Sequence, residues 1–215
     1  ERGTMFDPGP CFYMDKIIVP PAAVGAVDPE APAPEVVRAT AAALGRRAGD
    51  LTVAVLDRPR HQELMQQVRD TGARVRLLPD GDVAGAILVG SDDTGVDLLL
   101  GNGGTPEGVI AAAVMRCLGG EIQGRLTALD DKQRARLHAL GYDDLTRIYR
   151  TEDLAPGEEI VFSATGVTDG ELLKGVRFFG GGSRTSTLFM SLQRRIIRFV
   201  DTIRREDLSM PVQFN

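Results

Sequence analysis

The chain has 215 residues, of which 43% are hydrophobic and 26% are charged, and its formal net charge at pH 7 is −5. This composition is typical of a soluble globular protein, and the negative charge gives no general reason to expect nucleic acid or a membrane surface as a partner. Cys11 and Cys117 are the only cysteines, too few for a disulfide framework or a zinc motif, so we expect reduced thiols and a cytoplasmic protein. The longest apolar runs are far shorter than the ~20 residues of a membrane span.

The first fifty residues predict a strand, a loop and a helix. Tyr13 to Val19 has the pattern of a sheet strand, yet the chain has no start Met, so we expect it to begin inside a larger protein. Residues 22–35 are rich in Ala and Pro and predict a loop or linker, and residues 35–47 predict a helix. We assign residues 1–50 to the end of an N-terminal sheet domain with its linker, and residues 51–215 to an α/β substrate-binding domain.

Residues 51–118 alternate between strand and helix. Runs typical of strands at 51–56, 74–78 and 96–100 are followed by helical patterns at 61–71, at 83–89 and from 105 onward. This alternation predicts a mainly parallel sheet covered by helices. In such sheets ligands collect at the carboxyl ends of the strands. Polar clusters follow all of these strands, at residues 57–60, 80–82 and 101–107.

The cluster at residues 101–107 predicts a glycine turn that leads into a helix. Its glycines allow a sharp turn or a close approach of the backbone to another group. Thr105 can cap the helix, Pro106 suits its first position, and Glu107 lies in its first turn. Backbone amides at such a junction can bind an anion, or the glycines can serve only to start the helix. The residues alone leave both interpretations open.

Arg58 and Arg60 are candidates for binding a phosphate. They flank Pro59 directly after a predicted strand, and guanidinium groups offer paired donors to phosphate oxygens. The alternative is a surface arginine pair at a helix start, which contributes little. Tyr13, among other apolar residues, is either a core residue or a ligand contact.

Carboxylates form the second set of candidates. Asp80 and Asp82 flank Gly81 and could hold sugar hydroxyls, a metal or an ammonium group, or form only a helix cap and turn. Glu107 could bind a metal, or could be an acid placed favourably at a helix N-terminus. His61 and His138 have no Ser or Cys partner at a recognisable spacing, so we interpret both as structural.

The rest of the chain predicts a strand at 121–126, a charged helix at 130–140 and a strand at 160–165. Residues 176–179 and 186–192 predict a hairpin around three glycines, and residues 194–205 a terminal strand or helix. The turn at 165–170 is either a loop, which its residues favour, or a further anion site.

Five runs of this sequence closely resemble the class II, or GlpX-type, fructose-1,6-bisphosphatases of bacteria. They follow that family's order and spacing, and the resemblance extends from Met5 to about Asp201. The runs are Met5-Phe-Asp-Pro-Gly-Pro10, Asp57-Arg-Pro-Arg-His61, Asp80-Gly-Asp-Val-Ala-Gly-Ala-Ile87, Gly103-Gly-Thr-Pro-Glu-Gly108 and Ala164-Thr-Gly-Val-Thr-Asp-Gly170.

The resemblance implies a layered α/β/α/β/α sugar-phosphatase fold, like that of inositol monophosphatases, of which this chain would form the larger, C-terminal part. It implies hydrolysis of fructose 1,6-bisphosphate to fructose 6-phosphate in gluconeogenesis, with Mg²⁺ or Mn²⁺ as cofactor, in a homo-oligomer without nucleic-acid or membrane partners. By matching motifs Glu107 is the metal ligand. The substrate-binding positions are Tyr13, Arg58, Pro59, Arg60, Asp80, Gly81, Asp82 and Gly104.

The sequence also departs from the family. The resemblance implies a preceding part of roughly a hundred residues that supplies most metal ligands and orients the attacking water, and this chain does not contain it. We therefore assign no catalytic residue within the chain. Two alternatives to the phosphatase remain: a catalytically incomplete module that binds sugar phosphate, and a related sedoheptulose-bisphosphate or inositol-phosphate phosphatase.

Overall fold

The computed structural model describes residues 3–9, 11–79, 81–92, 94–170 and 172–206. The chain divides into two compact units, Glu1–Gly157 and Glu158–Asn215. The domain boundary predicted after residue 50 does not coincide with this division, because β1 (Tyr13–Val19) and β2 (Thr52–Leu56) are strands of one sheet. Each unit is described by itself.

The first unit is built on a six-stranded mixed sheet with the order β3-β2-β4-β1-β5-β6. β2 runs parallel to β3 (Arg74–Leu78) and β4 (Leu98–Gly104), whereas β1 is antiparallel to β4 and to β5 (Glu121–Thr127). The short β6 (Ile148–Arg150), which the sequence did not predict, pairs with β5. The α/β class is confirmed. The parallel arrangement expected for the strands of residues 51–118 is confirmed for β2, β3 and β4, but the whole sheet is mixed, because β1 inserts antiparallel between β4 and β5.

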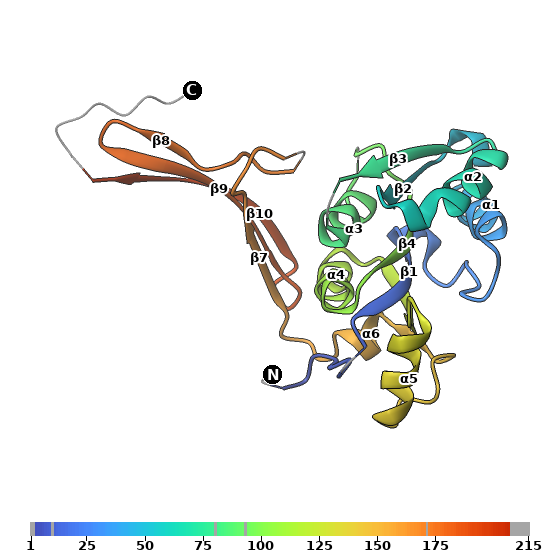
Figure 1. Cartoon of the computed structure of the whole chain (residues 1–215). Helices are drawn as coiled ribbons and strands as arrows, with labels where there is room; N and C mark the ends of the chain where they lie inside the picture. The colour runs from blue at the N-terminus through green and yellow to red at the C-terminus, as the bar shows by residue number, and fades with distance from the viewer. Residues whose placement is uncertain (1–2, 10, 80, 93, 171, 207–215) are drawn as a thin grey trace. The chain divides into compact units, whose positions relative to one another are not determined.

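Helices cover both faces of this sheet (Figure 1). On one face, α1 (Ala33–Ala43) and α2 (Gln62–Asp70) pack on the strands through a common apolar core. Burial of such side chains is the main favourable term in folding. The core includes Val36, Val37, Val53, Val55, Met65, Val68, Leu98 and Leu100. The opposite face carries α3 (Asp82–Gly90) and α4 (Thr105–Leu118), each with a run of buried apolar residues.

The smaller elements complete the unit. α5 (Asp131–Ala139) begins after Asp130, whose carboxylate accepts a 2.7 Å hydrogen bond from the Gln133 amide, a standard N-cap. The one-turn α6 (Thr151–Leu154) and the 3₁₀ helices at Pro21–Ala23, Ala48–Asp50 and Pro59–His61 were not predicted. Among the described residues, no helix has the length and apolar character needed to cross a membrane.

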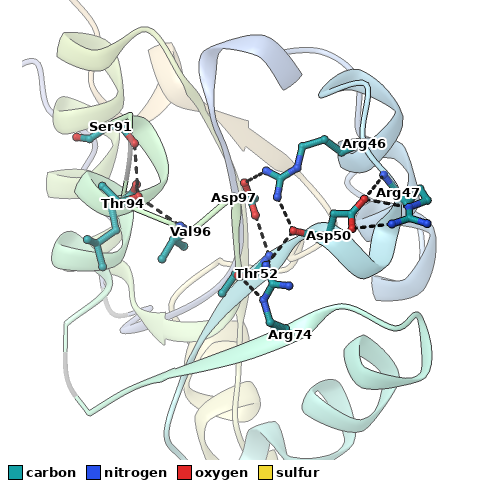
Figure 2. Close-up of polar contacts among 10 residues, drawn as sticks. Arg46, Arg47, Asp50, Thr52, Arg74, Ser91, Thr94, Val96 and Asp97 are labelled. Atoms are coloured by element: carbon teal, nitrogen blue, oxygen red, sulfur yellow. Dashed lines mark hydrogen bonds and ion pairs between the residues drawn. The ribbon is translucent and has the colours of Figure 1, made fainter.

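A polar network fixes the amino-terminal ends of β2 and β4 (Figure 2). The Asp97 carboxylate accepts bonds from the Thr52 amide at 2.8 Å and from the Arg46 guanidinium at 2.5 Å. Arg74 donates to the Thr52 hydroxyl at 3.1 Å and to the Asp50 carbonyl at 3.0 Å. This network holds the amino-terminal ends of β2 and β4 together. The predicted site residues lie at the opposite, carboxyl-terminal ends of these strands.

The second unit is a small antiparallel sheet. Its central strand β9 (Gly182–Ser191) pairs with β7 (Val161–Thr165), β8 (Arg177–Phe179) and β10 (Ile196–Arg205). The predicted hairpin is present, with Phe179 opposite Gly182, although β9 begins earlier than expected. The terminal segment that predicted a strand or a helix is the strand β10, because it pairs along its whole length with β9.

Candidate functional site

The glycine-rich segment 101–104 is strand, and the predicted turn is wrong at this point. β4 continues through Gly104, which lies opposite Tyr13 of β1, and Gly103 lies opposite Met14. The chain turns only where α4 begins at Thr105. Gly104 occupies the N-cap position and no side chain caps the helix, so the capping role predicted for Thr105 is also wrong. Thr105 is instead buried, and its amide donates to the Phe12 carbonyl at 2.8 Å.

The carboxyl ends of β2, β3 and β4 share one edge of the sheet, because these strands are parallel. The predicted clusters after β2 and β4 meet there. Arg60 donates two hydrogen bonds to the Asn102 carbonyl, at 2.8 and 3.3 Å, and so connects the ends of β2 and β4. Arg58 donates at 2.8 Å to the Pro79 carbonyl and so connects β2 with the end of β3. Asp80 itself lies outside the described residues.

Tyr13 joins this edge from β1. The guanidinium carbon of Arg60 lies 5.9 Å from the centroid of the Tyr13 ring, within the range of a cation–π contact. The Tyr13 side chain is half-buried, while Arg60 is exposed. Arg60 is thus held between the aromatic ring and the backbone of β4, with its charge accessible to a ligand.

Lys16 is the site residue that the sequence reasoning missed. It is buried on the face of β1 that also carries Met14 and Ile18, and its ammonium group forms an ion pair with Asp82 and donates to the Gly104 carbonyl at 2.6 Å. Burial lowers the pKa of Lys16, and the charge of Asp82 opposes that shift. The available signal was a lysine at an inward position of an alternating strand, which calls for a buried acidic partner.

Glu107 lies exposed in the first turn of α4 and bends back over Gly104. A Cβ atom at Gly104 would overlap the Glu107 carboxylate, and one at Gly103 would overlap the carboxylate of Asp82. These glycines are therefore needed for close approach of two carboxylates to the backbone rather than for a turn. Asp82 itself is the buried first residue of α3.

His61 is buried and links β2 with β4. Its Nδ1 lies 2.8 Å from the Leu56 carbonyl oxygen, and its Nε2 accepts a 2.9 Å hydrogen bond from the Asn102 amide. The Nδ1 therefore carries the proton, since it faces an acceptor and Nε2 faces a donor. His138 is exposed in α5 and pairs with Asp143.

A cavity of about 550 Å³ adjoins this edge on the α1–α2 face of the sheet. Arg60 and Asn102 border it, and its polar wall includes Asp15, Arg125 and Thr127. Asn102 donates to Asp15 at 2.9 Å and to Thr127 at 2.7 Å, so its side-chain amide is fixed in one orientation. Tyr13, Gly104 and Glu107 lie outside the cavity lining.

The arrangement suits a phosphorylated ligand better than a complete metal centre. Within the described part of the chain, no three His, Cys, Asp or Glu side chains gather closely enough to hold a metal ion. The carboxylate of Asp82 is occupied by Lys16, which leaves Glu107 as one possible metal ligand at this edge. Arg58, Pro59, Arg60, Tyr13, Gly104 and Glu107 all lie along it, whereas the predicted turn at 165–170 belongs to the second unit.

Comparison with known proteins gives consistent matches over almost the whole chain. The family model described as bacterial fructose-1,6-bisphosphatase, glpX-encoded, matches residues 1–204. A Synechococcus sp. (strain JA-3-3Ab) protein named D-fructose 1,6-bisphosphatase class 2/sedoheptulose 1,7-bisphosphatase is 45% identical over 223 residues, covering 98% of this chain and 64% of that protein. A protein of the same name from Crocosphaera subtropica is 48% identical over 215 residues, covering 94% and 62%. The chain therefore spans less than two thirds of the length of these relatives.

Proposed function

We propose a function from one premise: this chain belongs to the family of bacterial, glpX-encoded fructose-1,6-bisphosphatases. The proposal is that the chain supplies the substrate-binding part of an enzyme that hydrolyses fructose 1,6-bisphosphate to fructose 6-phosphate and phosphate. The observation that carries it is the shared edge of β2, β3 and β4, where Arg58 and Arg60 are anchored to neighbouring strand ends beside Tyr13 and Gly104.

The roles follow from the chemistry of the groups. Arg58 and Arg60 bind a phosphate, because guanidinium groups offer paired donors to phosphate oxygens and Pro59 stiffens the segment between the two arginines. Asp80, Gly81 and Asp82 bind hydroxyl groups of the sugar, and Asp82 does so through its backbone because its carboxylate is paired with Lys16. Tyr13 and Gly104 complete this edge of the site, and the absent Cβ of Gly104 leaves room for the Glu107 carboxylate beside the backbone.

Glu107 is the proposed ligand of a divalent cation, Mg²⁺ or Mn²⁺, which would neutralise phosphate charge and activate water when bound. An oxygen donor of this kind suits a hard cation. The remaining ligands would come from outside the described residues, since these contain no cluster of metal-binding side chains around Glu107. We further propose that the enzyme acts in gluconeogenesis, in the cytoplasm and as a homo-oligomer.

Sedoheptulose 1,7-bisphosphate is a second candidate substrate. The printed names of the relatives from Synechococcus and Crocosphaera include sedoheptulose 1,7-bisphosphatase as well as D-fructose 1,6-bisphosphatase. Both sugars carry two phosphates and several hydroxyls, which the same arginines and the segment 80–82 can bind. A substrate panel that includes inositol phosphates separates these activities.

The decisive variant is Glu107→Ala in the full-length protein. Because the Glu107 side chain is exposed, the variant should keep the thermal midpoint of the wild type and lose at least tenfold in Mn²⁺-dependent release of phosphate from fructose 1,6-bisphosphate. Glu63→Ala is the matched control, since Glu63 is an exposed glutamate in the first turn of α2 and lies outside the site. Unchanged activity of Glu107→Ala would show that Glu107 is not a ligand of the divalent cation. Absence of phosphate release by the wild type would instead favour a module that only binds sugar phosphate.

A further inference from the structure

Lys16 forms a bridge between two segments of the proposed substrate edge. Its side chain is completely buried and its ammonium group donates to the Asp82 carboxylate and, at 2.6 Å, to the Gly104 carbonyl. Asp82 begins α3, the helix that follows β3 in the chain, and Gly104 ends β4 and precedes α4. One side chain on β1 therefore contacts the starts of both helices on that face of the sheet.

This bridge fixes the orientation of the peptide group between Gly104 and Thr105. The carbonyl of that group accepts from Lys16, while its amide, on Thr105, donates to the Phe12 carbonyl at 2.8 Å. Both polar atoms of the peptide are thus held by residues of β1 or its start. Glu107 bends over the same Gly104, so its carboxylate lies next to this fixed peptide group.

A buried lysine would be an expensive way to achieve packing alone. Its neighbours on the same face of β1, Met14 and Ile18, are fully buried apolar side chains, and an apolar residue at position 16 would avoid the desolvation of a charge. Replacing a buried ion pair with apolar residues is often neutral or stabilising. The pair is therefore better explained by the geometry that it imposes than by a gain in stability.

We propose that Lys16 is a positioning residue, which holds the segment 81–82 and the β4–α4 junction in the relative placement that phosphosugar binding requires. The inference rests on the proposed function, because the two segments are its proposed substrate contacts. Catalytic geometry is sensitive at this scale, since a displacement of about 1 Å can cost ~10²-fold in rate. Lys16 touches neither sugar nor phosphate and acts through the backbone of Gly104 and through Asp82.

Lys16→Met in the full-length protein tests this, with Ile18→Ala as the control. Ile18 is equally buried on the same face of β1, so its truncation lowers stability without removing the bridge. We expect Lys16→Met to raise KM for fructose 1,6-bisphosphate about tenfold and to accelerate amide hydrogen exchange selectively in residues 81–86 and 104–108. Ile18→Ala should lower the thermal midpoint and leave KM within about threefold. The same KM and exchange pattern in both variants, or no change in Lys16→Met, overturns the proposal.

A second comparison covers the case in which Lys16→Met does not fold because Asp82 is left unpaired. Asp82→Asn removes that charge and keeps the Lys16 bond to Gly104, whereas the double variant Lys16→Met/Asp82→Asn removes both. Faster amide hydrogen exchange of residues 104–108 in the double variant than in Asp82→Asn supports the bridging role of Lys16. Equal exchange in these two variants overturns the proposal. Because hydrogen exchange requires no turnover, this arm decides the role of Lys16 even if the wild type releases no phosphate and the proposed function fails.

Discussion

Gly104 shows how a single residue without a side chain can define the site. Its backbone angles, φ −60° and ψ 137°, are ordinary for any residue, so glycine is not required there for conformational freedom. What requires it is the Glu107 carboxylate, which occupies the space that a Cβ would fill. The neighbouring Gly103 leaves the same room for Asp82.

Gly104→Ala should therefore displace Glu107 and leave the fold intact. The clash falls on the far end of an exposed, flexible side chain, so the thermal midpoint should stay close to that of the wild type. If Glu107 binds the cation, the Mn²⁺ concentration that gives half-maximal phosphate release should rise about tenfold, which corresponds to ~1.4 kcal/mol. Gly49→Ala is the control, because a Cβ there would make only an ordinary contact, at 3.6 Å. An unchanged Mn²⁺ requirement in Gly104→Ala would contradict the proposed role of Glu107.

Single residues also mark the limit of the sequence analysis. The placement of Arg58, Arg60 and Tyr13 at one edge of the sheet could be predicted, because they stand next to recognisable strand ends or within motifs that resemble a known family, and their binding roles stay predictions. Lys16 was missed: its inward position on an alternating strand calls for a buried acidic partner, but nothing local identifies Asp82, which is 66 positions away in the chain. The connection of His61 to Asn102 depends on the same kind of long-range contact.

At the scale of elements, periodicity was reliable and local turn chemistry was not. The strands and helices between residues 51 and 118 follow their apolar patterns closely. The glycine run 101–104 predicts a turn by composition, yet pairing with Tyr13 to Lys16 keeps it extended. Tertiary hydrogen bonds in the middle of a sheet thus outweigh the low intrinsic strand preference of glycine.

The antiparallel pair β9–β10 carries a testable ion pair. Asp201 lies opposite Ser186, and Arg184 donates to its carboxylate at 2.9 Å from a diagonal position. The hydrogen bond from Arg184, followed by that from Ser186, lowers the pKa of Asp201 below its ordinary value of 3.8. The unfolded chain therefore binds the proton more readily, and stability that is present above pH 3.8 is lost as the pH falls through the lower folded-state pKa.

Asp201→Asn should accordingly have a lower thermal midpoint than the wild type near pH 6. The difference between the two midpoints should shrink as the pH falls below 3.8. The effect will be small, on the order of 1 °C in the thermal midpoint, because the pair is solvent-exposed and screened. Calorimetric melting of both proteins between pH 2 and pH 7 measures it. A difference that stays constant with pH would show that the carboxylate does not contribute through its charge.

For the molecule as a whole, the α/β class and the family could be predicted from the order of motifs, and the mixed sheet could not. β1 stands before a long Ala/Pro-rich segment in the chain, and nothing local shows that it fills the place between β4 and β5. The division after residue 157 also escaped prediction, because it depends on how contacts cluster and not on composition. The full ligand set of the proposed metal site could not be predicted from this sequence, since its further ligands would lie outside the described residues.

We propose that the carboxyl-terminal edge of β2, β3 and β4 serves hydrolysis of the 1-phosphate of fructose 1,6-bisphosphate. The most direct measurement is ³¹P NMR of that sugar during incubation with the full-length protein and Mn²⁺. We expect the 1-phosphate resonance to disappear while inorganic phosphate appears in equal amount and the 6-phosphate resonance remains. Persistence of both sugar-phosphate resonances, or loss of the 6-phosphate first, would contradict it.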